Sequence, residues 1–177
     1  KATVANERFA EGLALVGDEL VQLTWKEGIA ARYAVSDLSP RGEFRYVGEG
    51  WGLTQDGQRL VMSDGSDRLI FRDPKTFAPI GEISVVRAGQ PAFRLNELEY
   101  ALGSIWANVW QSEEILAIDP TTGEVTAVVD ASNLLTGEDR ANAEVLNGLA
   151  WNPEQKRFYV TGKYWPKLFE VEFVPVP

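Results

Sequence analysis

A carboxylate, an amide and an ammonium stand at matching places of a repeated pattern in this chain. Glu11 and Asn96 each lie two residues before a Leu that belongs to a strand-like segment, and Lys163 follows another such segment. A carboxyl group can carry a proton from one atom of a substrate to another. An amide can orient a substrate group or stabilise an oxyanion, and an ammonium can assist the carboxylate or the oxyanion. Together these residues could perform acid–base chemistry.

Aromatic side chains stand beside these polar positions. Phe9 lies two residues before Glu11, Trp51 occupies the equivalent of the Glu11 position in another copy, and Trp25 and Trp110 each follow a second strand. Apolar walls of this kind raise the pKa of a carboxyl group toward neutrality. On the residues alone, the three Trp side chains fit a core equally well, and Glu11 could simply form an ion pair or cap backbone amides.

The repeated pattern indicates the elements that must position these side chains. A small polar or acidic residue beside Gly or Leu precedes a strand, a turn and a second strand. The marker residues Leu13, Leu53, Leu98 and Leu149 follow one another at steps of 40, 45 and 51 residues. Repeats of roughly 20–50 residues are typical of solenoids, propellers and arrays.

The segments between the markers alternate apolar and polar residues, as strands do. Turns of the Asp-Pro type recur later in two units, at Asp73 and Asp119, so each unit predicts four short antiparallel strands, with outer strands at 43–47, 79–85 and 124–129. We therefore predict an all-β fold, a β-propeller with four-stranded antiparallel blades and four blades in this chain. The strands of a barrel or a sandwich would also alternate apolar and polar residues, but neither fold explains why the same short segment recurs every 40 to 51 residues.

The last unit holds three strands, because the prolines that end the chain cannot donate ladder hydrogen bonds. Ala2–Ala5 is a candidate for the missing outer strand, and a helical turn is expected within 131–144. Inner strands line the axis of a propeller, so the recurring phrases converge on one mouth. It would collect side chains from all four units: Glu11, Trp25, Trp51, Asp64, Asn96, Trp110, Asn147 and Lys163.

Composition excludes several kinds of chemistry. The chain of 177 residues has no Cys and no His, which removes thiol nucleophiles, imidazole bases and the usual zinc ligands. The net charge of −9 argues against nucleic acid and anionic membranes as partners. No apolar run approaches the roughly 20 residues of a membrane span. We expect one domain over residues 1–177, and a monomer.

Eight short strings in this chain closely resemble the plant and bacterial type of glutaminyl cyclase. The order and spacing match from about Phe9 to Phe173. The strings are Phe9–Leu13, Leu23–Trp25, Gly48–Thr54, Met62–Ser66, Leu95–Tyr100, Ala107–Trp110, Val145–Ala150 and Val160–Pro166. One such string is weak evidence for a resemblance, but eight strings in the same order are strong evidence.

The resemblance implies a five-bladed propeller that converts the N-terminal glutamine of peptides or proteins to pyroglutamate and releases ammonia, in the periplasm or outside the cell, without a metal or other cofactor. By motif position, Glu11 matches the catalytic acid of the family. The pocket residues of the family match Phe9, Trp25, Trp51, Asn96, Trp110 and Lys163. The family pattern begins with one more blade, so residues 1–177 resemble the last four of five blades and we expect an N-terminal blade to be missing.

A second function belongs to another class. Many propellers bind rather than catalyse, and the fold alone does not choose between these roles. The same aromatic mouth could bind peptides or partner proteins without chemistry. Glu11 discriminates the two, because a binding module does not need a buried acid between aromatic walls. Loss of turnover in Glu11→Gln with the fold intact would favour the enzyme.

Overall fold

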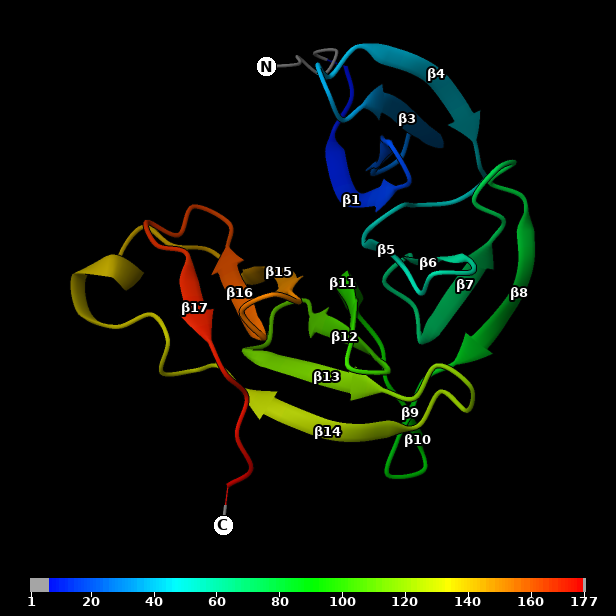
Figure 1. Ribbon diagram of the computed structural model, residues 1–177. Coiled ribbons are helices and arrows are strands. Elements are labelled where there is room, and N and C mark those ends of the chain that lie inside the picture. The colour runs from blue at the N-terminus through cyan, green and yellow to red at the C-terminus, as the bar shows by residue number, and fades with distance from the viewer. Residues whose placement is uncertain (1–6, 177) are drawn as a thin grey trace.

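Short antiparallel strands form four sheets that follow one another around a common axis (Figure 1). The computed structural model describes residues 7–176. The first sheet holds β1 (Ala10–Val16), β2 (Glu19–Thr24), β3 (Ile29–Ala34) and β4 (Pro40–Arg45). The second holds β5 (Leu53–Gln55), β6 (Leu60–Ser63), β7 (Arg68–Arg72) and β8 (Pro79–Ser84).

The other two blades follow the same plan. The third sheet holds β11 (Leu95–Ala101), β12 (Ser104–Val109), β13 (Glu114–Ile118) and β14 (Val125–Asp130). The fourth holds β15 (Leu146–Asn152), β16 (Arg157–Gly162) and β17 (Phe169–Val171). In every sheet the order in space follows the order in the chain, and each neighbouring pair is antiparallel. This arrangement confirms the predicted propeller blades, including the three strands of the last unit.

The first strand of each blade lies nearest the centre of the molecule, and β4, β8 and β14 lie on its rim (Figure 1). Burial follows this order. Every residue of β6 is buried, whereas β4 and β8 are almost wholly exposed. Pro40 and Pro79 begin these two rim strands, where a residue without an N–H is tolerated.

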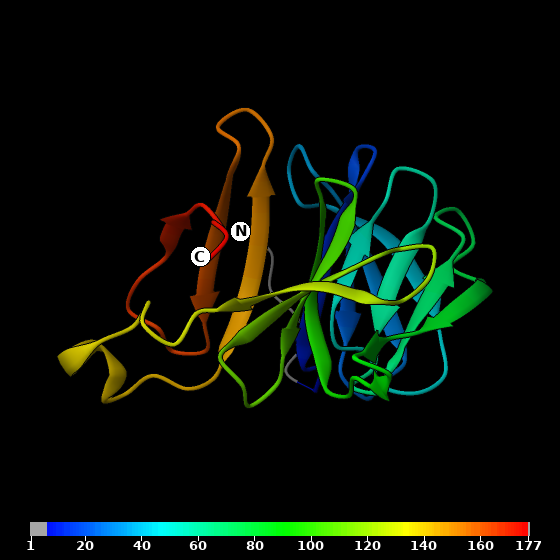
Figure 2. The same cartoon turned by 90° about the horizontal axis from the view of Figure 1, so that it is seen from below.

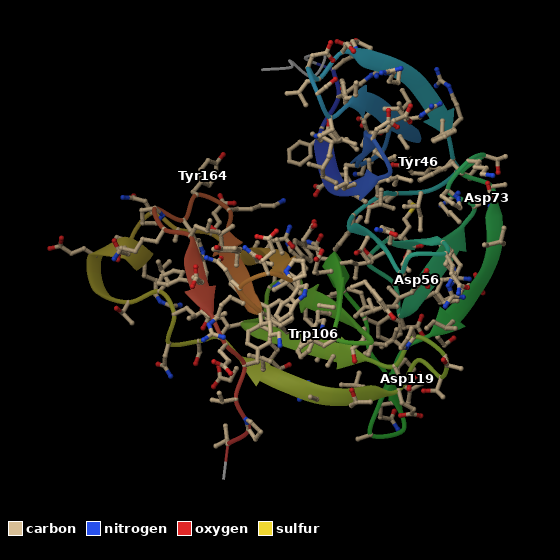
Figure 3. The ribbon with its side chains drawn as sticks, viewed as in Figure 1. Tyr46, Asp56, Asp73, Trp106, Asp119 and Tyr164 are labelled. Carbon is tan, nitrogen blue, oxygen red and sulfur yellow. The ribbon has the colours of Figure 1, made fainter. Side chains whose placement is uncertain are left out.

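Apolar side chains fill the spaces between neighbouring blades. Tyr46 belongs to the cluster between the first and second blades, and Trp106 to the cluster between the third and fourth (Figure 3). A third cluster, which includes Leu69 and Leu98, joins the second and third blades. The blades therefore stack face to face, and burial of these faces supplies the main driving force for folding.

Hydrogen bonds also link the blades near the axis. The amide of Gly12 donates to the carbonyl of Trp51 at 2.7 Å. The hydroxyl of Ser63 donates to the carbonyl of Asn96 at 2.7 Å. The amide of Glu97 donates to Oδ1 of Asn147 at 3.2 Å. These bonds fix the starts of the inner strands relative to one another, and those starts carry the candidate site residues.

The Asp-Pro turns are structural, as expected. Oδ1 of Asp73 accepts hydrogen bonds from the amides of Lys75 and Thr76, and Oδ1 of Asp119 accepts the equivalent pair in the third blade. These bonds hold the pKa of both Asp side chains below the usual range. Both turns lie far from the axis (Figure 3).

Four details of the prediction can be compared with the structure. The rim strand of the first blade was expected over 43–47 and runs over Pro40–Arg45, because Pro40 starts the strand and a register shift between Pro40 and Gly42 extends its pairing. A small ribbon of β9 (Val86–Arg87) and β10 (Gln90–Pro91) was not predicted. The helical turn expected within 131–144 is a 3₁₀ turn over Gly137–Arg140. The candidate outer strand Ala2–Ala5 lies outside the described residues.

The four blades form an arc rather than a closed ring. In Figure 1 the first blade, β1–β4, and the fourth, β15–β17, flank an opening. The 3₁₀ turn projects from the side of the fourth blade in both views (Figure 2). None of the helices among residues 7–176 is long and apolar enough to cross a membrane.

Candidate active site

A cavity of about 210 Å³ lies at the mouth where the four blades meet. Every blade contributes at least one side chain to its wall. The lining consists of Phe9, Glu11, Trp25, Trp51, Asn96, Trp110 and Lys163. These are seven of the nine residues that the sequence analysis placed at the mouth or in the pocket, and the fold brings them together from positions far apart in the chain.

Two local features of the strands aim these side chains into the cavity. The register of β1 against β2 shifts between Ala10 and Leu13, and β11 shifts against β12 between Leu95 and Leu98. Such bulges redirect side chains, here at the positions of Glu11 and Asn96. The second strands end immediately before the other members of the site: β2 before Trp25, β12 before Trp110 and β16 before Lys163.

Glu11 and Lys163 form the polar centre of the cavity. Nζ of Lys163 lies 3.8 Å from Oε1 of Glu11, and the Glu11 side chain is only 13% exposed. Burial raises the pKa of Glu11, and the positive charge of Lys163 opposes this rise. A carboxyl group whose pKa lies above its usual value holds a proton more readily, which suits a group that accepts a proton and passes it on.

Aromatic rings form the walls around this pair. Phe9 and Trp25 meet edge to face with ring centroids 5.9 Å apart, and Trp51 and Trp110 meet in the same way at 5.6 Å. Nζ of Lys163 also lies 5.4 Å from the centroid of Phe9. The edge-to-face contacts hold the rings at fixed angles, so the cavity has a defined apolar shape.

Asn96 brings an unpaired acceptor to the cavity. Its side chain is 4% exposed, and Oδ1 has no hydrogen-bond donor among the described residues. A buried polar atom without a partner costs about 1–3 kcal/mol. A donor that reached this oxygen would recover that free energy.

Two residues that were expected at the mouth do not line the cavity. Oδ1 of Asp64 accepts hydrogen bonds from the amide and the hydroxyl of Ser66 and so caps a turn. Asn147 uses Oδ1 to hold the amide of Glu97. Both residues follow or begin the strands at which they were predicted. Their short side chains form hydrogen bonds with Ser66 and with the amide of Glu97, and they do not line the cavity.

Comparisons with known proteins agree with this geometry. A family described as glutamine cyclotransferase matches residues 1–173. The chain belongs to the glutamine cyclotransferase family. A glutaminyl-peptide cyclotransferase of Arabidopsis thaliana is 38% identical over 171 residues, which are 94% of this chain and 53% of that protein. The chain thus spans about half the length of this curated relative.

A solved relative gives the same result for the fold. The crystal structure of the glutaminyl cyclase of Myxococcus xanthus matches with a TM-score of 0.89 and 45% sequence identity. The match covers 94% of this chain and 73% of that one. The four blades of this glutamine cyclotransferase family member therefore have the same arrangement as the corresponding part of a glutaminyl cyclase.

Glu49 supports the aromatic walls, and sequence reasoning did not identify it. Its Oε2 accepts hydrogen bonds from Nε1 of Trp25 at 2.7 Å and from Nε1 of Trp51 at 2.9 Å. These bonds hold the pKa of Glu49 below its usual value. The sequence places Glu49 two residues before Trp51, which could have indicated a contact with that ring. The hydrogen bond to Trp25 could not be foreseen, because it depends on how the ends of two strands pack together.

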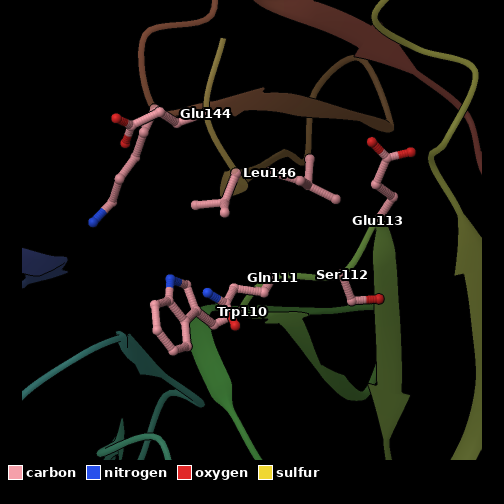
Figure 4. A pocket seen from close by; sticks show the side chains of 8 residues that line it. Trp110, Gln111, Ser112, Glu113, Glu144 and Leu146 are labelled. Atoms are coloured by element: carbon pink, nitrogen blue, oxygen red, sulfur yellow. The ribbon is translucent and has the colours of Figure 1, made fainter.

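A second cavity, of about 690 Å³, shares the walls of Trp110 and Lys163 with the first. It lies between the segment 110–113 of the third blade and the segment 144–146 of the fourth (Figure 4). Glu113 and Glu144 stand on opposite sides of it (Figure 4). Glu113 forms an ion pair with Arg140, and Glu144 is exposed. The mouth thus continues into a wider and more polar groove.

Proposed function

We propose that this protein is a glutaminyl-peptide cyclotransferase, which converts an N-terminal glutamine to pyroglutamate and releases ammonia. The observation that carries the proposal is the largely buried Glu11 side chain, paired with Lys163 and enclosed by aromatic rings. Family membership supports the same activity. The reaction needs one proton carrier, and the cavity offers one carboxyl group on its wall.

In the proposed reaction the α-amine nitrogen of glutamine attacks the carbonyl carbon of its own side chain. A new C–N bond closes the ring, and the bond to the amide nitrogen breaks. Glu11 accepts the proton that the amine loses and gives it to the leaving nitrogen, which departs as ammonia. No oxidant or second substrate is required, and Glu11 returns to its starting state.

The neighbours of Glu11 would position the substrate and stabilise charge. Oδ1 of Asn96 accepts an N–H of the substrate, because it has no other donor in the described part of the chain. Lys163 stabilises the oxyanion that forms on the attacked carbonyl and limits the pKa of Glu11. The walls formed by Phe9, Trp25, Trp51 and Trp110 fold the glutamine side chain back toward its own amine.

Peptides and proteins with an N-terminal glutamine are the proposed substrates. The smaller cavity accommodates the first residue, and the adjoining groove offers room for the residues that follow it. The groove is open and polar, so side chains beyond the first would be tolerated. An internal glutamine has no free amine and cannot react.

We also propose a monomer in the periplasm or outside the cell, without nucleic-acid or membrane partners. Synthesis begins with methionine, so an N-terminal glutamine arises only after proteolytic processing, which commonly accompanies export. The net charge of −9 opposes binding to polyanions. Fractionation of cells followed by immunoblotting would test the location. Light scattering of the purified protein would test the monomer.

We further propose that one more blade closes the ring, so that the described residues form four blades of five. The arc is open between the first and fourth blades (Figure 1). Leu13 and Leu15 of the first blade are 48% and 53% exposed. A blade in the opening would cover such side chains, because each of the other blade faces is packed against a neighbour.

Ammonia release from a dipeptide that begins with glutamine tests the proposed activity. Mass spectrometry of the product would show the loss of one ammonia from the peptide. A peptide with glutamine at its second position is the matched control, because it carries the same side-chain amide but the α-nitrogen of that glutamine is bound in a peptide bond and cannot attack. A parallel assay with a chelator would separate the reaction from catalysis by a bound metal. Absence of turnover in the folded protein would contradict the proposal.

A further inference from the structure

The groove that continues from the candidate active site carries a charge that its ion pairs do not cancel. Two carboxyl groups line it, those of Glu113 and Glu144, and they stand on opposite sides (Figure 4). Glu113 is paired with Arg140, and Lys163, the cation on the groove wall, is paired with Glu11. Glu144 forms no ion pair within the described part of the chain. The groove therefore presents one uncompensated negative charge, that of Glu144.

The backbone of Glu144 is held firmly at the edge of the fourth blade. Its amide donates to the carbonyl of Lys163 at 2.9 Å, and its carbonyl accepts a hydrogen bond from Nε1 of Trp165 at 2.9 Å. The amide of Lys163 in turn donates to the carbonyl of Val145 at 2.9 Å. These bonds extend the pairing of β15 and β16 beyond Leu146, the first residue of β15. Glu144 is thus carried on paired backbone and not on a free loop.

The same groove offers apolar surface beside this carboxylate. Trp110, Val145 and Leu146 line it, and Leu146 is buried. A Lys or Arg side chain covers apolar surface with its methylene stem and keeps its charged end near water or an acid. The face of an indole ring also attracts cations. A side chain with an apolar stem and a cationic end therefore matches both features of the groove.

The groove begins where the first residue of a substrate would end. Trp110 and Lys163 line both the smaller cavity and the groove, and Nζ of Lys163 lies 3.8 Å from Oε1 of Glu11. A peptide whose N-terminal glutamine reacts at Glu11 would extend past Trp110 into the groove. An extended chain rises by about 3.3 Å per residue. The second and third residues of the peptide are therefore the ones that would meet Glu144.

One further cation near the mouth lies at a different junction. The amide of Arg94 donates to the carbonyl of Gly65 in the second blade, and its guanidinium donates to Oε1 of Gln111 at 3.3 Å. The groove lies between the third and fourth blades, and Arg94 is not part of its lining. The charge that a side chain would meet inside the groove is therefore that of Glu144.

We propose that Glu144 is a specificity-determining residue, and that the protein favours peptides with Lys or Arg at the second or third position after an N-terminal glutamine. This role rests on the proposed cyclotransferase function. The cationic end of the substrate side chain lies at the carboxylate of Glu144, and its stem lies along Trp110 and Leu146. Because Glu144 is exposed, the ion pair gives a preference and not a strict requirement.

Two pairs of tripeptide amides measure this preference. Gln-Lys-Ala amide is compared with Gln-norleucine-Ala amide, because norleucine keeps a linear apolar stem and lacks the charge. Gln-Ala-Lys amide and its norleucine counterpart test the third position. We expect kcat/KM to be about two- to fivefold higher for the Lys peptide of at least one pair, the size expected of an exposed ion pair. The difference should lie in KM, since these residues take no part in the bonds that form and break.

Substitution of Glu144 separates its role from the net charge of the protein. In Glu144→Gln the Lys and norleucine peptides should become equal, and in Glu144→Lys the norleucine peptide should be favoured. Glu154→Gln removes the same charge in the exposed turn between β15 and β16, and should keep the preference. Salt raised from about 0.01 M to about 1 M shortens the screening length from about 30 Å to about 3 Å, and should also weaken the preference.

A binding measurement does not depend on turnover. Pyroglutamyl-Lys-Ala amide and its norleucine counterpart cannot react, and titration calorimetry compares their affinities, as it does for the pair with the third position changed. If the unsubstituted protein shows no turnover but binds a Lys form more tightly, and Glu144→Gln removes the difference, the cyclotransferase function fails and the specificity of the groove stands.

Three results would overturn the inference. The first is equal kcat/KM and equal binding within both pairs. The second is a Lys preference that survives in Glu144→Gln, because it would assign the preference to another carboxylate or to the net charge. The third is the absence of both turnover and detectable binding in the folded protein, which would contradict the cyclotransferase proposal as well.

Discussion

Glu11 is subject to two opposing effects that can be separated by substitution. Burial raises its pKa, and Lys163, with Nζ 3.8 Å from Oε1, lowers it. In Lys163→Met only the first effect remains, so the pKa of Glu11 should rise. Because Glu11 must be ionised to accept a proton, the acid limb of the kcat/KM profile should move to higher pH.

Lys75→Met is the control for this shift, because Lys75 lies in an exposed turn of the second blade far from the mouth. The pH profile of this control should match that of the unsubstituted protein. An acid limb that stays in place in Lys163→Met would mean that a group other than Glu11 governs it.

The aromatic walls depend on one carboxylate. Glu49 accepts hydrogen bonds from the indoles of Trp25 and Trp51. Glu49→Ala removes both bonds, and we expect a loss of about tenfold in kcat/KM, since a hydrogen bond to a charged group contributes about 1.5–3 kcal/mol and the rings remain packed. Glu124→Ala, at an exposed residue immediately before the rim strand β14, is the control. Equal kinetics of the two variants would contradict a positioning role for Glu49.

At the scale of single residues, position in the repeat found most of the cavity lining, although Asp64 and Asn147, at equivalent positions, bond to other groups instead. Glu11 and Asn96 share one place in the repeat, and Trp25 and Lys163 share another, so equivalent backbone positions carry them to one mouth. Position did not identify Glu49. Its hydrogen bonds to Trp25 and Trp51 depend on how closely the ends of neighbouring blades approach, and that distance is not encoded in the spacing of the repeats.

At the scale of elements, Ser63 joins two blades behind the cavity. Its side chain is fully buried, accepts a hydrogen bond from the amide of Gly52 and donates one to the carbonyl of Asn96. Ser63→Ala leaves both backbone groups without this partner, which should lower the free energy of unfolding by about 1–3 kcal/mol. Chemical denaturation measures the change, with the exposed Ser36→Ala as control. Equal stability of the two variants would contradict the role of this link.

The strands themselves could be predicted because alternation and turn chemistry are local. Each inner strand contains its marker Leu, and the Asp-Pro turns lie where the pattern placed them. The rim strand of the first blade began earlier than expected because Pro40 can start an edge strand. The ribbon of β9 and β10 has only two residues in each strand, too few for alternation to indicate it.

At the scale of the whole molecule, an open arc exposes apolar surface that a closed ring would bury. Leu15 is 53% exposed on the first blade, whereas Leu23 of the same blade is fully buried. Leu15→Ser should change the free energy of unfolding by no more than about 0.5 kcal/mol. Leu23→Ala should lower it by about 2–5 kcal/mol. Equilibrium denaturation of both variants provides the comparison.

Leu15→Ser also tests whether a further blade packs against the first blade and closes the ring. In a longer protein that includes a further blade, Leu15 would be covered, and Leu15→Ser should then cost more than it does here. An equally small effect in both proteins would argue that no blade packs on this face. The number of blades in this chain followed from counting repeats, whereas the proposed fifth blade has no repeat among the described residues.

The most direct test of the account compares Glu11→Gln with the unsubstituted protein in ammonia release from a glutamine-initiated peptide. Gln has nearly the same shape as Glu but cannot carry the proton, so we predict a loss of about 10²–10⁴-fold in kcat while circular dichroism and the unfolding transition are retained. Retained turnover in a folded Glu11→Gln variant would contradict the central claim, that one carboxyl group at the mouth of the propeller transfers the proton of cyclisation.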